Sequence, residues 1–338
     1  MAVSYIGLEL GSNSTWIYKL GNGVVLKEPS VIAMSNDLKN KEVRAVGTDA
    51  KNLIGRTSNN TSIFFPISNG VVQYEEYAVL MLKNFLNRIF TTKSFSHKIK
   101  AILCVPLGIT TEEKKQFEIV CFKAGITEVY IVPEVIAYAL ANGLDIKSKT
   151  AQLMVGIGAD VTNISIISNY SIVAGYNVSI GGSLVSLGII KHIEDKFFVT
   201  ISEEQAEILK TEICSLYDNY NARMPIVGIN KLSGIKEQVM IEASELYAVV
   251  CYYYIKIAEV IKSIIASSRP EVVSDVLKQG IIFYGGSSNI VGFEQFMHKK
   301  LGIRVKILEN SKPEIFGTEE LIKNPEKLKK ILKNNNLN

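Results

Sequence analysis

The chain has 338 residues and a formal net charge of +4, and hydrophobic residues make up 47% of it against 21% charged residues. This balance is typical of a well-buried globular protein of about two domains, and it argues against a disordered chain and against a nucleic-acid partner. Four widely spaced cysteines and three scattered histidines offer little material for a zinc site or a Ser-His-Asp triad. We therefore expect reduced cysteines and a cytoplasmic protein.

The apolar segments favour a protein without a membrane span. The N-terminus enters a strand with no basic region or cleavage-site pattern before it. The longest apolar run, 246–255, is shorter than the roughly twenty residues that cross a bilayer. Polar residues at helical spacing follow it, so we expect a core helix.

Two stretches of the chain match each other, 6–18 and 153–165. Each predicts a buried strand, a tight turn that begins at a glycine, and a returning strand. Gly11 and Gly158 are separated by the same interval as Thr15 and Thr162. Turns of this composition expose several backbone N–H groups and can bind anions, although either stretch alone would be typical of an ordinary hairpin. The repeated unit predicts two similar domains facing one another across a polyphosphate.

Strands alternate with helices in the first half of the chain. A helix is expected over 75–90, and Thr110 with Glu113 forms a capping box that opens a second helix ending near Gly125. Strands are expected at 101–106 and 129–132, followed by a helix over 135–142. We predict an α/β domain with a mixed sheet over residues 1–146, carrying a small insert at about 34–64.

The second half, residues 147–309, is expected to form the second domain, with a small insert at about 184–240. A strand is predicted over 171–178, and Ser202 with Gln205 caps a helix that we expect to run through Tyr217. A long helix over 241–266 precedes a buried strand that ends at Tyr284. The segment of about 310–338 is expected to be helical and to pack back on the first domain.

The order of these motifs resembles the actin and Hsp70 superfamily, and most closely the bacterial actin family MreB. The resemblance runs from about Ser4 to Gly317. It rests on segments 8–15, 28–33, 46–51, 55–57, 66–72, 105–110, 206–210 and 284–288. No single segment is specific, but together and in this order they are.

The resemblance implies an actin-like (ribonuclease H-like) α/β fold of two related domains, each with a small inserted subdomain, and a nucleotide cleft between them. ATP or ADP with Mg²⁺ would bind there. Glu134 would orient the attacking water and Glu9 would lie nearest the metal. The nucleotide-binding positions it implies are Gly11, Ser12, Asn13, Gly158, Ala159, Glu207, Lys210, Gly285, Gly286 and Ser287.

The sequence also departs from the family pattern. Both phosphate loops of the family begin with an aspartate, where this chain has Glu9 and Gly156. Asp160 stands where the family has a small residue, and its carboxylate would repel phosphates. Asn163 replaces an acidic residue and Cys214 a glycine. We expect a diverged paralogue with weak ATP hydrolysis, unless compensating side chains restore the site.

The leading functional hypothesis is therefore an ATP-binding, filament-forming bacterial actin-like cytoskeletal protein, concerned with cell shape or with the motility of a wall-less cell. Its partners would be copies of itself in protofilaments and other actin-like paralogues, with no nucleic acid. The alternatives are a small-molecule kinase of the actin fold and an Hsp70-like ATPase module.

A segment that mixes apolar and basic residues predicts weak contact with the inner face of the cell membrane. It runs from Ile89 to Lys100 and contains Phe90 and Phe95 among Arg88, Lys93, Lys98 and Lys100. Basic residues near an anionic surface contribute about 1 kcal/mol each. A solvated loop is the alternative.

Overall fold

The computed structural model describes residues 3–36, 42–57, 60–90, 98–308 and 311–335. The chain forms two compact units. Unit 1 comprises residues 1–148, 169–171 and 311–338, and unit 2 comprises residues 149–168 and 172–310. We describe each unit by itself.

Unit 1 is built on a five-stranded sheet in the order β10-β9-β1-β2-β3. Strands β10, β9 and β1 are parallel, whereas β1, β2 and β3 are joined antiparallel by short turns. This sheet forms the centre of the unit's core, because Ile, Leu and Val side chains on β1 and β9 are buried there. The strands are β1 (Val3–Leu10), β2 (Ser14–Lys19), β3 (Gly23–Pro29), β9 (Lys98–Val105) and β10 (Glu128–Pro133).

One helix of unit 1, α3 (Thr111–Ala124), begins and ends at the signals expected from the sequence. Thr110 and Glu113 form the capping box of α3, and Gly125 ends it in the left-handed conformation. An added Cβ on Gly7 would lie 1.9 Å from Thr318 Oγ1, so α10 packs directly on β1. The helices are α2 (Glu75–Ile89), α3 (Thr111–Ala124), α4 (Glu134–Ala141), α10 (Gly317–Lys323) and α11 (Pro325–Asn334), with the 3₁₀ turn η2 (Glu314–Phe316).

Unit 1 also contains a small sheet in the order β5-β4-β6. Its strands lie in the sequence between β3 and α2. It has its own apolar cluster around Val31, Ala33 and Ala50. The elements of this part are β4 (Ile32–Ser35), β5 (Val43–Val46), α1 (Thr48–Lys51) and β6 (Thr61–Phe64), followed by the hairpin β7 (Ile67–Ser68) and β8 (Val71–Val72).

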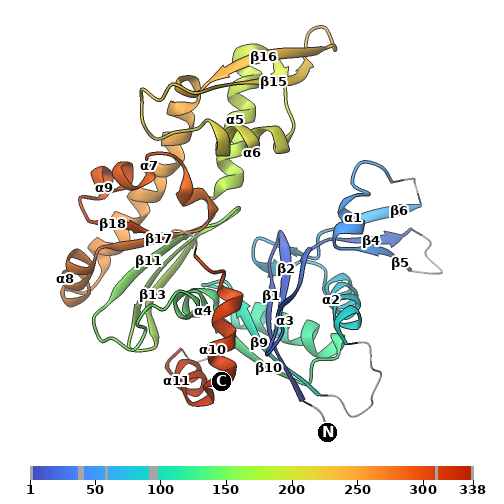
Figure 1. Cartoon of the computed structure of the whole chain (residues 1–338), viewed down its shortest axis with the longest axis vertical. Helices are drawn as coiled ribbons and strands as arrows, with labels where there is room; N and C mark the ends of the chain where they lie inside the picture. Colours follow the sequence, from blue (N-terminus) through green and yellow to red (C-terminus); the bar gives the residue numbers. More distant parts are fainter. Residues whose placement is uncertain (1–2, 37–41, 58–59, 91–97, 309–310, 336–338) are drawn as a thin grey trace. The chain divides into compact units, whose positions relative to one another are not determined.

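Unit 2 repeats the main sheet of unit 1, with the order β13-β12-β11-β17-β18 (Figure 1). Strand β11 pairs antiparallel with β12 and parallel with β17, as β1 does with β2 and β9. The two matching stretches of sequence are therefore equivalent hairpins of two related sheets. The strands are β11 (Gln152–Ile157), β12 (Thr162–Ser168), β13 (Ser171–Val178), β17 (Ile281–Tyr284) and β18 (Val305–Ile307).

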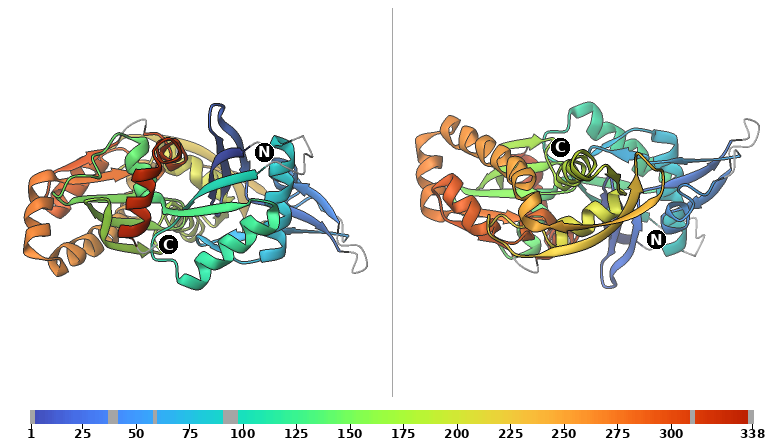
Figure 2. Two further views of the ribbon diagram at one scale, coloured as in Figure 1. Left: turned by 90° about the horizontal axis from the view of Figure 1, so that it is seen from below. Right: turned by 90° about the horizontal axis from the view of Figure 1, so that it is seen from above.

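Helices α8 and α9 of unit 2 lie against its main sheet, at β11 and β18, where Figure 2 shows them in orange and red. Helices α5 and α6 pack on each other and on the small sheet β14-β15-β16. The elements are α5 (Gly182–Phe197), α6 (Glu203–Glu212), α7 (Ala243–Ser267), α8 (Pro270–Gln279), α9 (Phe293–Leu301), the 3₁₀ turn η1 (Gly286–Asn289), β14 (Val199–Thr200), β15 (Arg223–Asn230) and β16 (Lys236–Glu242).

One helix end was predicted wrongly. The helix capped by Ser202 ends at Glu212 and does not run through Tyr217. The chain leaves the helix because Ser215 forms a bridge with Val291 and the amide of Leu216 donates to the Val291 carbonyl. A pairing with a segment about 75 residues later therefore overrides the local helical pattern. Across the described residues, no helix is both long and apolar enough to span a bilayer.

Candidate functional site

The first glycine turn, 11–13, joins β1 to β2 in unit 1. Its backbone is fixed by a hydrogen bond from the Gly11 amide to the Ser14 carbonyl at 3.1 Å. The Ser12 hydroxyl accepts from the Gly70 amide at 3.0 Å, and the Asn13 carbonyl accepts from the Ser30 amide at 3.1 Å. Within the described parts of the chain, the amides of Ser12 and Asn13 donate to no protein acceptor. Such amides are the donors that an anion would use.

Three carboxyl groups of unit 1 interact beside this turn. Glu9 lies near the end of β1, Glu134 is the first residue of α4, and Glu314 begins η2. The carboxyl groups of Glu9 and Glu314 lie close enough to perturb each other's ionisation. Burial, and then the charge of Glu314, raises the pKa of Glu134 to about 8. Burial, followed by the charges of Glu314 and Glu134, also raises the pKa of Glu9 well above its ordinary value.

Sequence analysis did not find Glu314. It follows a proline in a short segment without periodicity, and it reaches Glu9 only because η2 packs on β1 and α4. No local pattern in the sequence signals this contact between segments about 300 residues apart. Burial raises the pKa of the neighbouring Cys104 thiol, and the same three carboxyl groups add to that effect. A thiol held protonated in this way is a poor nucleophile, as expected for a core cysteine.

The raised carboxyl pKa values predict a stability that falls with pH. Because the folded chain holds protons on Glu9 and Glu134 that the unfolded chain releases above pH 4.5, their contribution is full below that pH and is lost as the pH rises through about 8. We expect the free energy of unfolding to fall by on the order of 2 kcal/mol between pH 5.5 and 8.5, measured by urea denaturation without nucleotide.

Glu314→Gln should reduce this loss, because it removes the charge that disfavours ionisation of the other two groups. Glu326→Gln is the matched control on the same C-terminal segment, since Glu326 is exposed and forms a surface ion pair with Lys329. An unfolding free energy that is constant or that rises over this pH range would contradict the account.

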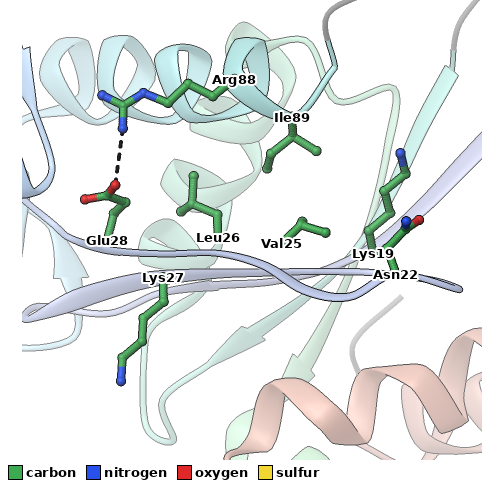
Figure 3. Close-up of a pocket in the computed structure, with 8 residues that line it drawn as sticks. All are labelled: Lys19, Asn22, Val25, Leu26, Lys27, Glu28, Arg88 and Ile89. Carbon is green, nitrogen blue, oxygen red and sulfur yellow. Dashed lines mark hydrogen bonds and ion pairs between the residues drawn. The ribbon is translucent and has the colours of Figure 1, made fainter.

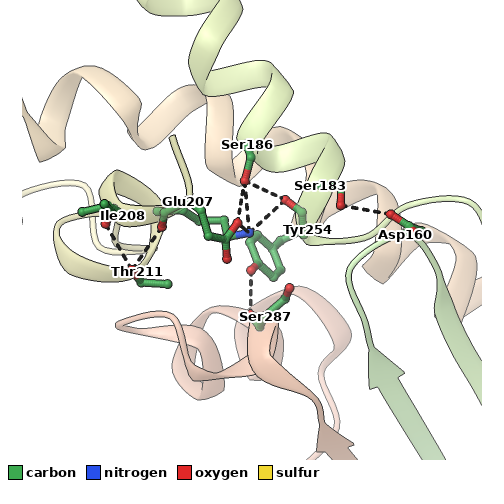
Figure 4. A network of polar contacts seen from close by, with 10 residues as sticks. Asp160, Ser183, Ser186, Glu207, Ile208, Thr211, Tyr254 and Ser287 are labelled. Atoms are coloured by element: carbon green, nitrogen blue, oxygen red, sulfur yellow. Dashed lines mark hydrogen bonds and ion pairs between the residues drawn. The ribbon is translucent and has the colours of Figure 1, made fainter. Parts of the chain in front are cut away.

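The second glycine turn, 158–161, is fastened to the start of α5 in unit 2. The Gly158 and Ala159 carbonyls accept from the amides of Gly182 at 2.9 Å and Ser183 at 2.7 Å. The Ser183 hydroxyl donates to Asp160 Oδ1 at 3.0 Å (Figure 4). The carboxylate of Asp160, which we expected to repel phosphates, is thus held by a hydroxyl at the edge of the turn. The Ala159 amide donates to no described residue.

Lys210 and Glu207 form the centre of a polar network in unit 2, in which Figure 4 shows Glu207 and Ser186. The Lys210 side chain is only 8% exposed, and its ammonium group donates to the Gly182 carbonyl at 3.0 Å, to Ser186 Oγ at 3.2 Å and to Glu207. Ser186 also donates to Glu207 at 2.9 Å. The Glu207 side chain nevertheless remains 54% exposed. One face of its carboxylate can therefore accept hydrogen bonds from a ligand hydroxyl.

The third loop, Gly285–Ser287, closes the other side of this network. Gly285 has φ +93° and an added Cβ would lie 2.4 Å from the Ile157 carbonyl, so only glycine fits there. Gly286 differs, since an added Cβ would have nothing within 4 Å. The Ser287 carbonyl accepts from the Tyr254 hydroxyl at 2.6 Å, which fixes the loop against α7. The loop thus offers open space over Gly286, while Ser287 Oγ and Lys210 Nζ both lie next to Gly182.

Gly156 is covered by the ring of Tyr284. The two residues are neighbours in the parallel pairing of β11 with β17. A Cβ added to Gly156 would lie 2.4 Å from Tyr284 Cζ and 2.7 Å from Tyr284 Oη. Position 156 therefore has no room for a side chain while position 284 is tyrosine. Sequence analysis noted the glycine but missed the tyrosine that accompanies it.

This close contact predicts strong coupling between the two positions. Gly156→Ala alone should destabilise the chain by about 1–3 kcal/mol through overpacking. Tyr284→Thr alone should destabilise it by several kcal/mol through the cavity that it leaves. The double variant should be less destabilised than the sum by about 1 kcal/mol or more, measured by chemical denaturation.

The matched control combines Gly156→Ala with Tyr253→Thr. Tyr253 lies against Gly188 and not against Gly156, so those two effects should add. Additive effects in the Gly156 and Tyr284 pair would refute the contact.

A separate pocket of about 450 Å³ lies in unit 1 between β2, β3 and the end of α2 (Figure 3). It contains none of the site residues named from the sequence.

The basic residues expected to contact a membrane are partly paired within the protein. Arg88, which lines this pocket, is paired with Glu28 at 3.2 Å, and Lys100 pairs with Glu128. Two of the four basic residues expected to contact a membrane are therefore already in ion pairs. Phe95 and Lys93 lie outside the described residues.

The donor set for a metal ion is incomplete. Among the residues that the structure describes, no three His, Cys, Asp or Glu side chains are placed to hold a metal ion together. Mg²⁺ is usually bound by one or two carboxylates together with substrate phosphates. Glu9 could be one such carboxylate in unit 1, whereas the end of β11 in unit 2 offers none.

Comparisons with known proteins match this architecture. Residues 3–330 match the family described as MreB/Mbl protein. The cell shape-determining protein Mbl of Bacillus subtilis is 29% identical over 327 residues, which cover 96% of this chain and 97% of Mbl. The cell shape-determining protein MreB of Escherichia coli K12 is 29% identical over 308 residues, covering 90% of this chain and 89% of that protein.

A solved structure shares the fold over nearly the full length. The crystal structure of MreB5 of Spiroplasma citri bound to ADP has a TM-score of 0.86 and 28% identity, and the match covers 96% of this chain and 97% of MreB5. The actin-like α/β fold expected from the sequence is therefore confirmed.

Proposed function

Because this chain belongs to the MreB/Mbl family over nearly its whole length, we propose that it binds an adenine nucleotide and assembles with copies of itself into cytoskeletal filaments. The nucleotide proposal draws on MreB5, which has been crystallised with ADP. The assembly proposal draws on the cell shape-determining role named for the Mbl and MreB relatives. We do not propose a small-molecule kinase or a chaperone module, since neither belongs to this family.

The observation that carries the nucleotide proposal is the arrangement around Lys210 in unit 2. The second glycine turn, the start of α5, and Glu207 on α6 are tied together by one buried ammonium group and its neighbours. We propose that the exposed side of Glu207 binds the ribose hydroxyls. The open space over Gly286 would receive the base, and the Ala159 amide would donate to a phosphate.

Gly286→Leu tests this proposal, because its Cβ enters a space with no heavy atom within 4 Å. We expect the unfolding free energy to change by no more than about 0.5 kcal/mol, whereas ATP binding, measured by isothermal titration calorimetry, is lost. Ser274→Leu adds the same bulk on the exposed side of α8 and should leave binding unchanged. Unaltered ATP affinity in Gly286→Leu would place the base elsewhere.

We also propose that hydrolysis is slow. Glu134 would orient the attacking water, and it must be ionised to accept the water's proton. Its raised pKa, and that of Glu9, make this costly at neutral pH unless a bound cation favours the ionised forms. Glu9 is the side chain of unit 1 that we expect nearest to Mg²⁺, which would supply charge neutralisation of the phosphates. Unit 2 adds no carboxylate at position 156.

Phosphate release should therefore be on the order of a hundredfold slower than that of Escherichia coli MreB measured alongside it. Gly156→Asp combined with Tyr284→Thr should accelerate release, because the second change makes room for the first. Glu134→Ala should remove that gain, and Glu326→Ala should not. Native release at the rate of the relative, lost on Glu134→Ala, would mean that hydrolysis is intact.

Membrane contact and pairing with other actin-like paralogues remain proposals. The ion pairs of Arg88 and Lys100 lower the positive charge that a membrane would attract. We therefore expect any contact at the inner face of the cell membrane to depend on the apolar residues, of which Ile89 and Phe90 are described.

A further inference from the structure

The end of β11 is the point where unit 2 departs most from a metal-assisted phosphate site. Tyr284 fills the only space that a side chain at Gly156 could enter, with its ring carbons within 2.5 Å of the Cβ position. On the other side of β11, Gly156 is paired with Asn163, which carries an amide and no charge. Tyr284 is buried. With glycine at position 156 and tyrosine at position 284, the group at the end of β11 is therefore a neutral ring and not a carboxylate.

The remaining carboxylates around this turn are already engaged by the protein. Asp160 accepts from the Ser183 hydroxyl, and Glu207 accepts from Lys210 and Ser186. Each carboxylate near this turn in the described part of unit 2 is therefore fixed by a protein donor at its edge, and the end of β11 itself presents none to a hydrated cation. The residues present do not suit a divalent cation on this side of the nucleotide.

We propose that nucleotide binding by this chain depends little on Mg²⁺, because Tyr284 occupies the space in which β11 would otherwise present an acidic side chain. The inference rests on the proposed nucleotide site. An aspartate at position 156 would have two effects: it would attract a hydrated cation on the phosphates, and it would repel phosphates that carry no cation.

Both effects have a size that a binding measurement resolves. Two unit charges about 8 Å apart at an effective dielectric constant of about 20 interact strongly enough to change an affinity by about tenfold or more. With glycine and tyrosine at these positions, the end of β11 supplies neither that attraction nor that repulsion. The metal-free and the metal-bound nucleotide should then bind with similar affinity.

The direct test titrates the native chain with ATP by calorimetry, once with Mg²⁺ in excess and once with EDTA. We expect dissociation constants within about threefold of each other. Binding that weakens by about tenfold or more in EDTA would overturn the inference while leaving the nucleotide site in place. Absence of binding under both conditions would instead refute the proposed function itself.

Two double variants identify the cause. Gly156→Asp with Tyr284→Thr should weaken binding in EDTA by about tenfold relative to Mg²⁺. Gly156→Ala with Tyr284→Thr creates the same room without the charge and should keep the native indifference to Mg²⁺. Equal behaviour of the two variants would overturn the role given to this position. A thermal melt checks that each variant is folded, and the native titration decides the inference if either is not.

Discussion

A buried ammonium group holds the candidate nucleotide-binding side of unit 2 together. Lys210 is nearly inaccessible, and its three donors are matched to a backbone carbonyl, a hydroxyl and a carboxylate. A buried charge is tolerated only when it is fully paired in this way, so α5 and α6 cannot separate without a large cost in free energy. The Gly182 carbonyl that Lys210 binds belongs to the residue whose amide holds Gly158. Lys210 thus helps to fix the position of the second glycine turn through Gly182.

Unit 1 carries a different electrostatic arrangement on the same sheet topology. Its glycine turn lies beside carboxyl groups, and among the described residues of unit 1 no lysine is buried to offset them. Burial, and then the charges of the neighbouring carboxyl groups, keep the pKa values of Glu9 and Glu134 high. The two halves of the repeat have therefore diverged in charge while the pairing of their strands has been kept.

Local sequence signals predicted much of this molecule. The two glycine turns and both capping boxes depend on residues close together in the chain, and the structure shows each of them. The family and its fold, inferred from the order of motifs, are confirmed. Glu314, Tyr284 and the end of α6 were missed because each is decided by a segment far away in sequence. A lone glutamate after a proline, or a tyrosine at a strand end, has no periodicity that reveals its partner.

If the network around Lys210 forms one side of an adenine nucleotide site, a crystal structure of this chain grown with ADP should show the nucleotide on it. We expect a base over Gly286, ribose hydroxyls on Glu207 and a phosphate oxygen accepting from the Ala159 amide. A bound nucleotide that contacts none of these three residues, with the space over Gly286 left empty, would contradict it.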